Sequence, residues 1–184
     1  MYIPIHDNWK VIEIGGGANP CPRADVITNY ESEKHQRGVH PKIVDTADMI
    51  ECDVQDMSRF KDKEFDYSLC VQVLEHVPDP IKACQEIMRI SKAGYIECPR
   101  VLCEKLIGID SHVWEVDTND NILIFKKKTQ FHRFDDFFYN LFYSKNPAQE
   151  EFKRIYFKYA DEWLVRFHWE ERFDVTVINN TGVI

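Results

Sequence analysis

Five short apolar runs, each rich in β-branched residues, alternate with turn and helix signals in the first hundred residues of the chain. Strands that are buried on both faces, as in a parallel sheet, have this composition. The runs lie at residues 10–14, 25–28, 49–52, 67–74 and 94–98. Their alternation with connecting segments predicts a doubly wound α/β fold.

The connections between these runs are of two kinds. Before the fifth run, residues 80–90 place apolar side chains at helical spacing, and Asp79 followed by Pro80 is a typical helix start. After the first run, Pro20 and Pro22 occupy the positions where a crossover helix would begin. Proline lacks the backbone N–H donor and interrupts a helix. We therefore expect a helix over residues 80–90 and an unusually short first crossover.

The second half of the chain is rich in aromatic residues. Residues 121–125 and 175–178 are predicted to be strands. Between them, large apolar residues recur at three- and four-residue spacing, which predicts two helices with one buried face each. These residues are Phe131, Phe134, Phe138, Leu141 and Phe142 in the first helix, and Phe152, Ile155, Tyr156, Tyr159 and Trp163 in the second. The two faces are expected to pack in the core or to cover a binding site.

Composition narrows the class of protein. A chain of 184 residues with 44% hydrophobic and 29% charged residues fits a single globular domain. Its net charge of −8 disfavours nucleic acid and anionic membranes as partners. The basic run Lys126, Lys127 and Lys128 is interpreted as a solvated hairpin tip. No apolar stretch approaches the roughly 20 residues that cross a membrane.

The cysteines are scattered, form no CxxC pair and lie partly within apolar runs, which predicts reduced core residues. They are Cys21, Cys52, Cys70, Cys84, Cys98 and Cys103. The N-terminus lacks the basic and apolar regions of a signal peptide. We therefore expect a cytoplasmic protein, while no pattern indicates its oligomeric state.

A glycine cluster follows the first apolar run directly. Gly15, Gly16 and Gly17 predict a sharp turn in which backbone N–H groups approach a ligand closely. Loops of this kind serve nicotinamide dinucleotides as well as S-adenosylmethionine. A dinucleotide loop needs a small residue three positions after Gly17, where this chain has Pro20. Glu13 places a carboxylate where it can oppose the ammonium group that S-adenosylmethionine has and NAD lacks. Both features favour S-adenosylmethionine.

Four ordered segments resemble motifs of class I S-adenosylmethionine-dependent methyltransferases. The glycine segment is similar to the first motif, and residues 49–54 are similar to the third-strand motif. Residues 64–80 resemble the fourth strand with its LEHV turn, which is typical of a small-molecule subgroup, and residues 93–99 resemble the fifth strand. The four sequences are VIEIGGGANP, MIECDV, EFDYSLCVQVLEHVPDP and AGYIECP. Together they span residues 11–100 in the order that the family has.

The resemblance implies a Rossmann-like class I methyltransferase fold. Its sheet would be mostly parallel and seven-stranded, with an antiparallel last strand and helices on both faces. Residues 173–178 are expected to supply the antiparallel strand beside the fifth, and residues 121–125 the sixth strand. The chain would form one domain over residues 1–184, with a cofactor-binding half at 1–100 and an acceptor-side half at 101–184.

The resemblance also implies the residues that bind the cofactor, S-adenosylmethionine. They are Glu13, Gly15, Gly16, Gly17, Asn29, Asp53, Val54 and Gln72. Asn29 stands where the family has the acid that holds the ribose, and Glu31 is the alternative. An amide binds a diol without the charge-assisted strength of a carboxylate. Asp53 is expected at the adenine amino group, although an aspartate at such a position also caps a turn.

His76 and His112 are the candidate catalytic residues, because neutral imidazole accepts a proton near pH 7. Each histidine also has a structural interpretation: Glu75 and His76 as a hydrogen-bonded corner, and His112 as a loop residue. Some methyltransferases hold a divalent metal with an ExxEH sequence here. This chain has Gln72 in place of the first glutamate, and an amide is a weaker ligand, so no metal is predicted. Trp114 is interpreted as a core residue.

The sequence thus predicts an S-adenosylmethionine-dependent methyltransferase acting by in-line displacement on a small-molecule acceptor whose identity is not indicated. Two alternatives stay open. One is a methyltransferase-like binding protein without turnover, suggested by Asn29 and the short first crossover. The other is an NAD-dependent oxidoreductase.

Overall fold

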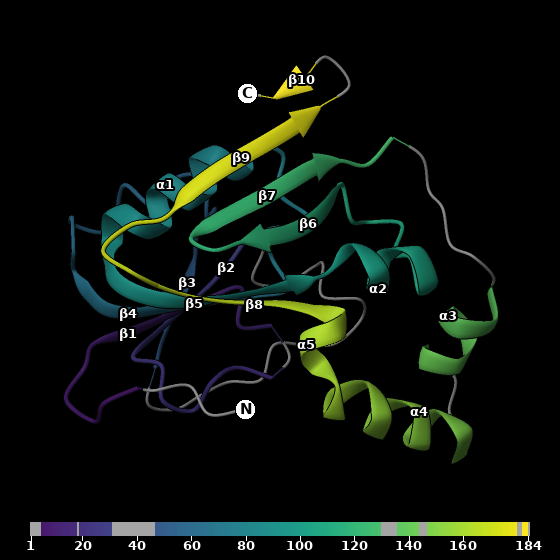
Figure 1. Cartoon of the computed structure of the whole chain (residues 1–184). Helices are drawn as coiled ribbons and strands as arrows, with labels where there is room; N and C mark the ends of the chain where they lie inside the picture. Colours follow the sequence, from purple (N-terminus) through teal and green to yellow (C-terminus); the bar gives the residue numbers. More distant parts are fainter. Residues whose placement is uncertain are drawn as a thin grey trace.

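Two β-sheets form the framework of the chain (Figure 1). The computed structural model describes residues 5–17, 19–30, 47–129, 136–143, 147–179 and 182–183. The predictions for Glu31, Phe131 and Phe134 lie outside these residues. Within them, the α/β class and the mostly parallel main sheet are confirmed.

The main sheet has the strand order β3-β2-β1-β4-β5-β8. Its strands are β1 (Val11–Ile14), β2 (Val26–Asn29), β3 (Asp48–Glu51), β4 (Phe65–Val71), β5 (Ser91–Pro99) and β8 (Leu164–Glu170). The first five are the predicted strands and are parallel, whereas β8 is antiparallel to β5. The chain order reverses between β1 and β4, and open α/β sheets bind ligands at the carboxyl ends of the strands beside such a point.

The antiparallel edge strand differs from the prediction. Residues 173–178 were expected beside β5, but β8 pairs there, with Tyr95 opposite His168. The main sheet has six strands in the described part of the chain, not seven. Val165, Phe167 and Trp169 of β8 are buried and alternate with more exposed residues. This period-two pattern is the signal of a strand with one buried face.

The residues expected to extend the main sheet form a second sheet instead. Its order is β10-β9-β7-β6, with β6 (Trp114–Asn119), β7 (Ile122–Lys127), β9 (Asp174–Asn179) and β10 (Gly182–Val183). β7 and β9 are the two strands predicted in the second half, and they pair with each other in parallel. The placement of residues 121–125 as a sixth strand of the main sheet was therefore wrong.

Helix α1 (Pro80–Ile90) matches the predicted helix residue for residue. The Asp79 side chain accepts a hydrogen bond of 3.0 Å from the Lys82 N–H, as the cap predicted. Ala83, Cys84, Ile87 and Ile90 are fully buried. They share one apolar cluster with residues of both sheets, because α1 and the second sheet lie on the same side of the main sheet (Figure 1).

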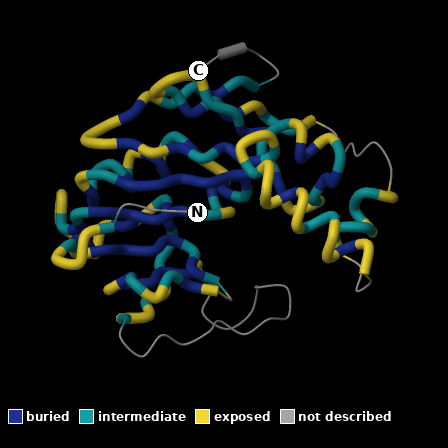
Figure 2. Tube along the Cα trace, turned by 60° about the horizontal axis from the view of Figure 1, so that its bottom comes forward, coloured by how far each residue is buried: buried dark blue, intermediate teal, exposed yellow. Residues whose placement is uncertain are grey.

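The other face of the main sheet carries a smaller cluster of Val11, Tyr67, Leu69 and Tyr95. The described residues that cover it, including Ile5 and Trp9, belong to no helix. Helices were expected on both faces; α1 packs on the face of the larger cluster, and α5 contacts β8 through the ion pair of Asp161 with Arg166. The central strands β1, β2, β4 and β5 are buried along most of their length (Figure 2).

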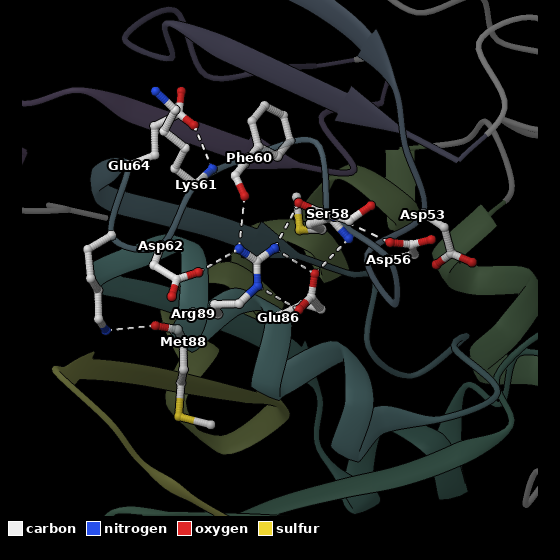
Figure 3. Close-up of polar contacts among 12 residues, drawn as sticks. Asp53, Asp56, Ser58, Phe60, Lys61, Asp62, Glu64, Glu86, Met88 and Arg89 are labelled. Atoms are coloured by element: carbon white, nitrogen blue, oxygen red, sulfur yellow. Dashed lines mark hydrogen bonds and ion pairs between the residues drawn. The ribbon is translucent and has the colours of Figure 1, made fainter.

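Arg89 on α1 fixes the long connection between β3 and β4 (Figure 3). Its guanidinium donates to the carbonyls of Met57 and Phe60 at 2.8 Å, and to the carboxylates of Glu86 and Asp62 at 2.8 and 2.9 Å. Glu86 in turn accepts the Met57 N–H at 2.8 Å. Arg89 thereby holds residues 57–62 of the connection that contains Asp53.

Four further helices gather where β5 ends (Figure 1). They are α2 (Val101–Leu106), α3 (Asp136–Tyr143), α4 (Pro147–Lys158) and α5 (Ala160–Trp163). α3 and α4 confirm the two predicted aromatic helices where these are described, and Trp163 falls on the separate α5. Tyr156 and Leu164 are buried there with Cys103 and Ile107 of the α2 segment. None of the described helices has the length and apolar character to cross a lipid bilayer.

The first crossover, the cysteines and the basic run can also be compared with their predictions. Residues 15–17 and 19–25, between β1 and β2, contain no helix, so the short first crossover is confirmed in the described residues. All six cysteines are free, and four of them are buried. The basic run is not a hairpin tip: Lys126 and Lys127 lie on β7, and the Lys128 side chain is 8% exposed.

Candidate active site

A cavity of about 890 Å³ opens at the carboxyl ends of β1, β2, β4 and β5. This volume is near the upper end of the range for small-molecule sites, about 300–1,000 Å³. Eight of the ten residues predicted for the site line it: Gly15, Gly17, Asn29, Asp53, Val54, Gln72, His76 and His112. The remaining two, Glu13 and Gly16, do not line it.

The glycine loop is shaped by two backbone conformations that side chains disfavour. Gly15 has φ +74°, and Gly17 has φ +58°. A Cβ on Gly15 would lie 2.3 Å from Val73 Cγ2. The Gly15 N–H donates to the Thr28 carbonyl at 2.7 Å, and the Gly17 N–H donates to Asn29 Oδ1 at 3.1 Å. The end of β2 therefore holds the loop at both glycines.

Glu13 lies behind this loop, not in the cavity. Its Oε2 accepts the Cys21 N–H at 2.6 Å, and the residue is 7% exposed. Burial raises the pKa of the Glu13 carboxyl, against the smaller opposite effect of the Cys21 N–H. A Cβ on Gly16 would lie 3.2 Å from the same oxygen. The hydrogen bond from Cys21 closes the clipped first crossover, and the contact of Glu13 with an ammonium group stays a prediction.

Asp53 makes the turn contacts that were its alternative interpretation. Its Oδ1 accepts the Gln55 N–H at 2.8 Å, and both of its carboxylate oxygens lie 3.2 Å from the Gln55 amide nitrogen. The same residue lines the cavity, with Val54 beside it. A carboxylate held in this way is fixed in direction, which suits a contact with a polar ligand group.

Gln72 is the first residue beyond β4 and has φ +58°. This conformation is uncommon for a residue other than glycine, and such residues concentrate at functional sites. The Gln72 N–H donates to the Glu97 carbonyl of β5 at 2.8 Å. That hydrogen bond holds the turn between β4 and the histidine segment.

Backbone hydrogen bonds bring His112 to His76 across 36 residues of chain. The Val113 and Trp114 N–H groups donate to the Glu75 carbonyl at 2.8 and 3.3 Å. The Trp114 indole donates to the Val77 carbonyl at 2.7 Å, and Trp114 is a core residue as predicted. The two imidazole rings lie 4.5 Å apart between centroids, at 84°.

A buried charge cluster holds His112 in place. Its Nδ1 makes a short hydrogen bond to Glu104 of α2, and Lys128 binds the other Glu104 oxygen at 2.9 Å. Burial opposes ionisation of Glu104, but His112 and Lys128 outweigh it and hold the pKa of this carboxyl below its ordinary value. Sequence reasoning missed Glu104, and it placed Lys128 in solvent.

The far part of the cavity is apolar and aromatic. Phe142 and Tyr143 of α3 and Tyr156 of α4 line it, together with Cys103 and Ile107. The Tyr156 hydroxyl lies 3.4 Å from Cys103 Sγ. The cavity therefore has a polar part between the glycine loop and Asp53, and an apolar part beyond the two histidines.

Residues 22–96 match the family model of a methyltransferase domain. The match covers less than half of the chain and supports a class I S-adenosylmethionine-dependent methyltransferase family. The topology described above is a mixed α/β, Rossmann-like fold. No curated protein matches the chain as a relative.

Solved structures with a similar arrangement are distant. A SAM-dependent methyltransferase from Thermotoga maritima is 21% identical, with a TM-score of 0.38 over 51% of this chain and 45% of its own. YcgJ from Bacillus subtilis is 17% identical, with 0.44 over 53% and 47%. The [4+2]-cyclase SpnF is 20% identical, with 0.41 over 50% and 39%. This chain thus aligns with about half or less of each structure, and these likenesses add nothing about chemistry.

Proposed function

We propose that this protein is a methyltransferase that takes its methyl group from S-adenosylmethionine and transfers it to a small molecule. The observation that carries the proposal is the cavity that joins the glycine loop to the paired histidines. The methyltransferase-domain match over residues 22–96 supports the same cofactor.

The polar part of the cavity is the proposed cofactor site. Gly15 and Gly17 border the amino-acid part of the cofactor, and Asn29 contacts the ribose, since its side-chain amide offers two donor hydrogens and two acceptor lone pairs. Asp53 and Val54 border the adenine, and Gln72 lies toward the sulfonium. Glu13 and Gly16 act indirectly, by holding the loop from behind.

The acceptor lies beyond the sulfonium, between the histidines and the aromatic residues of α3 and α4. A lone pair on its nucleophilic atom forms the bond to the methyl carbon. The sulfur–carbon bond breaks and its electron pair stays on sulfur, which leaves S-adenosylhomocysteine. Most of the rate comes from holding nucleophile and methyl in line, about 3 Å apart. For an acceptor that is still protonated, His76 or His112 takes the proton through Nε2.

Two further expectations remain part of the proposal. The chain forms one domain, with the cofactor half at residues 1–100 and the acceptor half at 101–184. A cytoplasmic location agrees with six free thiols, because reducing compartments keep cysteines unpaired.

Calorimetry tests the cofactor assignment directly. S-adenosylmethionine and S-adenosylhomocysteine should each bind with one site per chain, and NAD should not bind. Binding of NAD without binding of S-adenosylmethionine would overturn the proposal in favour of an oxidoreductase.

Turnover needs a separate experiment. The protein is incubated with S-adenosylmethionine carrying a deuterated methyl group and with a panel of phenols, alcohols, amines and thiols. Formation of S-adenosylhomocysteine together with a deuteromethylated product supports the methyltransferase. Cofactor binding with no transfer to a metabolite extract would instead favour the binding protein without turnover.

A further inference from the structure

We propose that Glu75, His76 and His112 form a binding site for a divalent transition-metal ion of the Zn²⁺ type. One potential ligand atom from each residue lies within 4.8 Å of the other two. The Nε2 atoms of both histidines are 3.9 Å from the same oxygen, Oε1 of Glu75. Glu75 and His112 are almost fully buried, and the three residues line the cavity.

The contacts of the two imidazole rings prepare them as ligands. His76 Nδ1 lies 3.0 Å from the Ser111 carbonyl, which only accepts hydrogen bonds, so the proton of the neutral ring is on Nδ1. In the same way, His112 Nδ1 donates its proton to the Glu104 carboxylate, which accepts the hydrogen bond. Both Nε2 lone pairs therefore point to the space beside Glu75. Histidines that bind metals almost always donate their other N–H to a carboxylate or a backbone carbonyl.

The ligand atoms lie within 4.8 Å of one another and would have to move closer together around an ion. Two ligands that are each about 2.1 Å from a tetrahedral ion lie about 3.4 Å apart, compared with the 3.9 Å from Glu75 Oε1 to each Nε2. Two imidazoles with one carboxylate suit Zn²⁺ and similar ions, whereas Mg²⁺ prefers oxygen ligands. Three protein ligands leave at least one position open, which is the arrangement of catalytic rather than structural sites.

The three ligand residues line the cavity, so an acceptor molecule in the cavity can occupy the open position on the ion. Ion binding itself is independent of the proposed methyl transfer, but its role rests on that function. An ion would lower the pKa of an acceptor hydroxyl bound to it through oxygen, so that the hydroxyl releases its proton to solvent more readily. Its oxygen then attacks the methyl carbon as described above. With an ion in place, the two Nε2 lone pairs are ligands, and neither histidine is the base.

Metal binding is tested on the chelator-treated protein with Co²⁺ as a spectroscopic probe. We expect one Co²⁺ per chain, with visible absorption that Zn²⁺ removes and Mg²⁺ leaves unchanged. His76→Gln should weaken Co²⁺ binding about 100-fold or more, and Glu104→Gln about 10–100-fold. His168→Gln is the matched control, because this exposed histidine lies on β8 outside the cavity and should not change binding.

The variants distinguish a binding defect from misfolding. His76 has a 35% exposed side chain, so His76→Gln should fold, which circular dichroism checks. Unchanged Co²⁺ affinity in folded His76→Gln, or equal competition by Mg²⁺, would overturn the metal site. Calorimetry with S-adenosylmethionine on the same samples separates the two proposals. Cofactor binding without Co²⁺ binding refutes only the metal site, and Co²⁺ binding without cofactor binding refutes only the proposed function.

Discussion

Asn29 connects the glycine loop to the proposed ribose site. Its Oδ1 accepts the Gly17 N–H at 3.1 Å, while the residue lines the cavity. Removal of the amide should leave the loop less ordered and also remove a contact with the cofactor. We predict that Asn29→Ala lowers the affinity for S-adenosylmethionine about 10-fold, which corresponds to about 1.4 kcal/mol.

Calorimetry on the purified variant measures this change. Asn119→Ala is the control, because Asn119 is exposed at the end of β6 and should bind the cofactor as the wild type does. Equal affinities of the Asn29→Ala and Asn119→Ala variants would contradict the assignment of Asn29.

Gly15 combines a left-handed backbone with a close neighbour. Alanine at this position would meet Val73 Cγ2 at 2.3 Å in addition to the penalty for φ +74°. We predict that Gly15→Ala lowers the free energy of unfolding by about 1–3 kcal/mol. The double variant Gly15→Ala/Val73→Ala should show positive coupling, because Val73→Ala removes the clash but not the backbone strain. Urea unfolding of the four proteins measures the coupling, and strict additivity would show that the clash does not occur.

The candidate site could be predicted from sequence only where short segments determine it. Gly15 and Gly17 follow β1, Asp53 follows β3 and His76 follows β4, each within five residues of the strand end, so the predicted strands placed them. Glu13 lies at the end of β1, so its position was also predicted. The direction of its side chain depends on Cys21, whose N–H donates to it across the clipped crossover. Glu104 offered no local signal, because its importance arises from contacts with His112 and Lys128 that only the folded chain makes.

At the scale of elements, Arg89 joins α1 to the segment after β3. It makes hydrogen bonds to two carbonyls and two carboxylates (Figure 3). We predict that Arg89→Met lowers the free energy of unfolding by about 2 kcal/mol, because hydrogen bonds of charged groups are lost from a half-buried site. Arg154→Met is the control: its pair with Glu151 is exposed to solvent and should contribute much less to stability. Urea unfolding at pH 7 compares them, and similar losses in both variants would contradict the role of Arg89.

The same contact predicts a pH dependence. The hydrogen bond from Arg89 lowers the pKa of Glu86 below its ordinary value of 4.5, against a smaller effect of burial and with help from the Met57 N–H. A carboxyl with a lowered folded-state pKa stabilises the fold fully above the unfolded-state value, and this contribution is lost as pH falls below it. The unfolding free energy of the wild type should therefore drop more steeply below pH 4.5 than that of Glu86→Gln. Urea titrations between pH 3 and pH 7 measure both slopes, and parallel curves would contradict the prediction.

Elements with a clear period were predictable, and elements defined by their partners were not. α1 and the strands β1 to β5 carry strong local patterns, and all were predicted. β8 has an alternating pattern, but the resemblance to a family favoured residues 173–178 for the same edge of the sheet. β6 and α2 were missed because each has only six residues, and the acidic and polar residues of β6 hide its buried side.

At the scale of the whole molecule, the two sheets share one core. Leu123 and Phe125 of β7 are fully buried in the same apolar cluster as Ile87 of α1 and Ile96 of β5. A sequence pattern indicates that a strand is buried, but not against which sheet. This explains why both late strands were recognised and then assigned to the wrong sheet.

A shared core predicts that the two sheets unfold together. We expect Leu123→Ala to lower the free energy of unfolding by about 2–5 kcal/mol, the range for removing a buried leucine side chain. The loss should displace the whole transition, so that tryptophan fluorescence and far-ultraviolet circular dichroism remain coincident in urea. Lys126→Ala, on the exposed side of the same strand, should change stability by less than about 0.5 kcal/mol.

Hydrogen exchange adds a sharper comparison. If the sheets unfold together, the free energy of opening measured at the β1 amides of Leu123→Ala should fall by the same amount as the free energy of unfolding. If β1 kept its protection while the amides of β7 and β9 lost theirs, the second sheet would be a separate folding unit, and the single domain would be refuted.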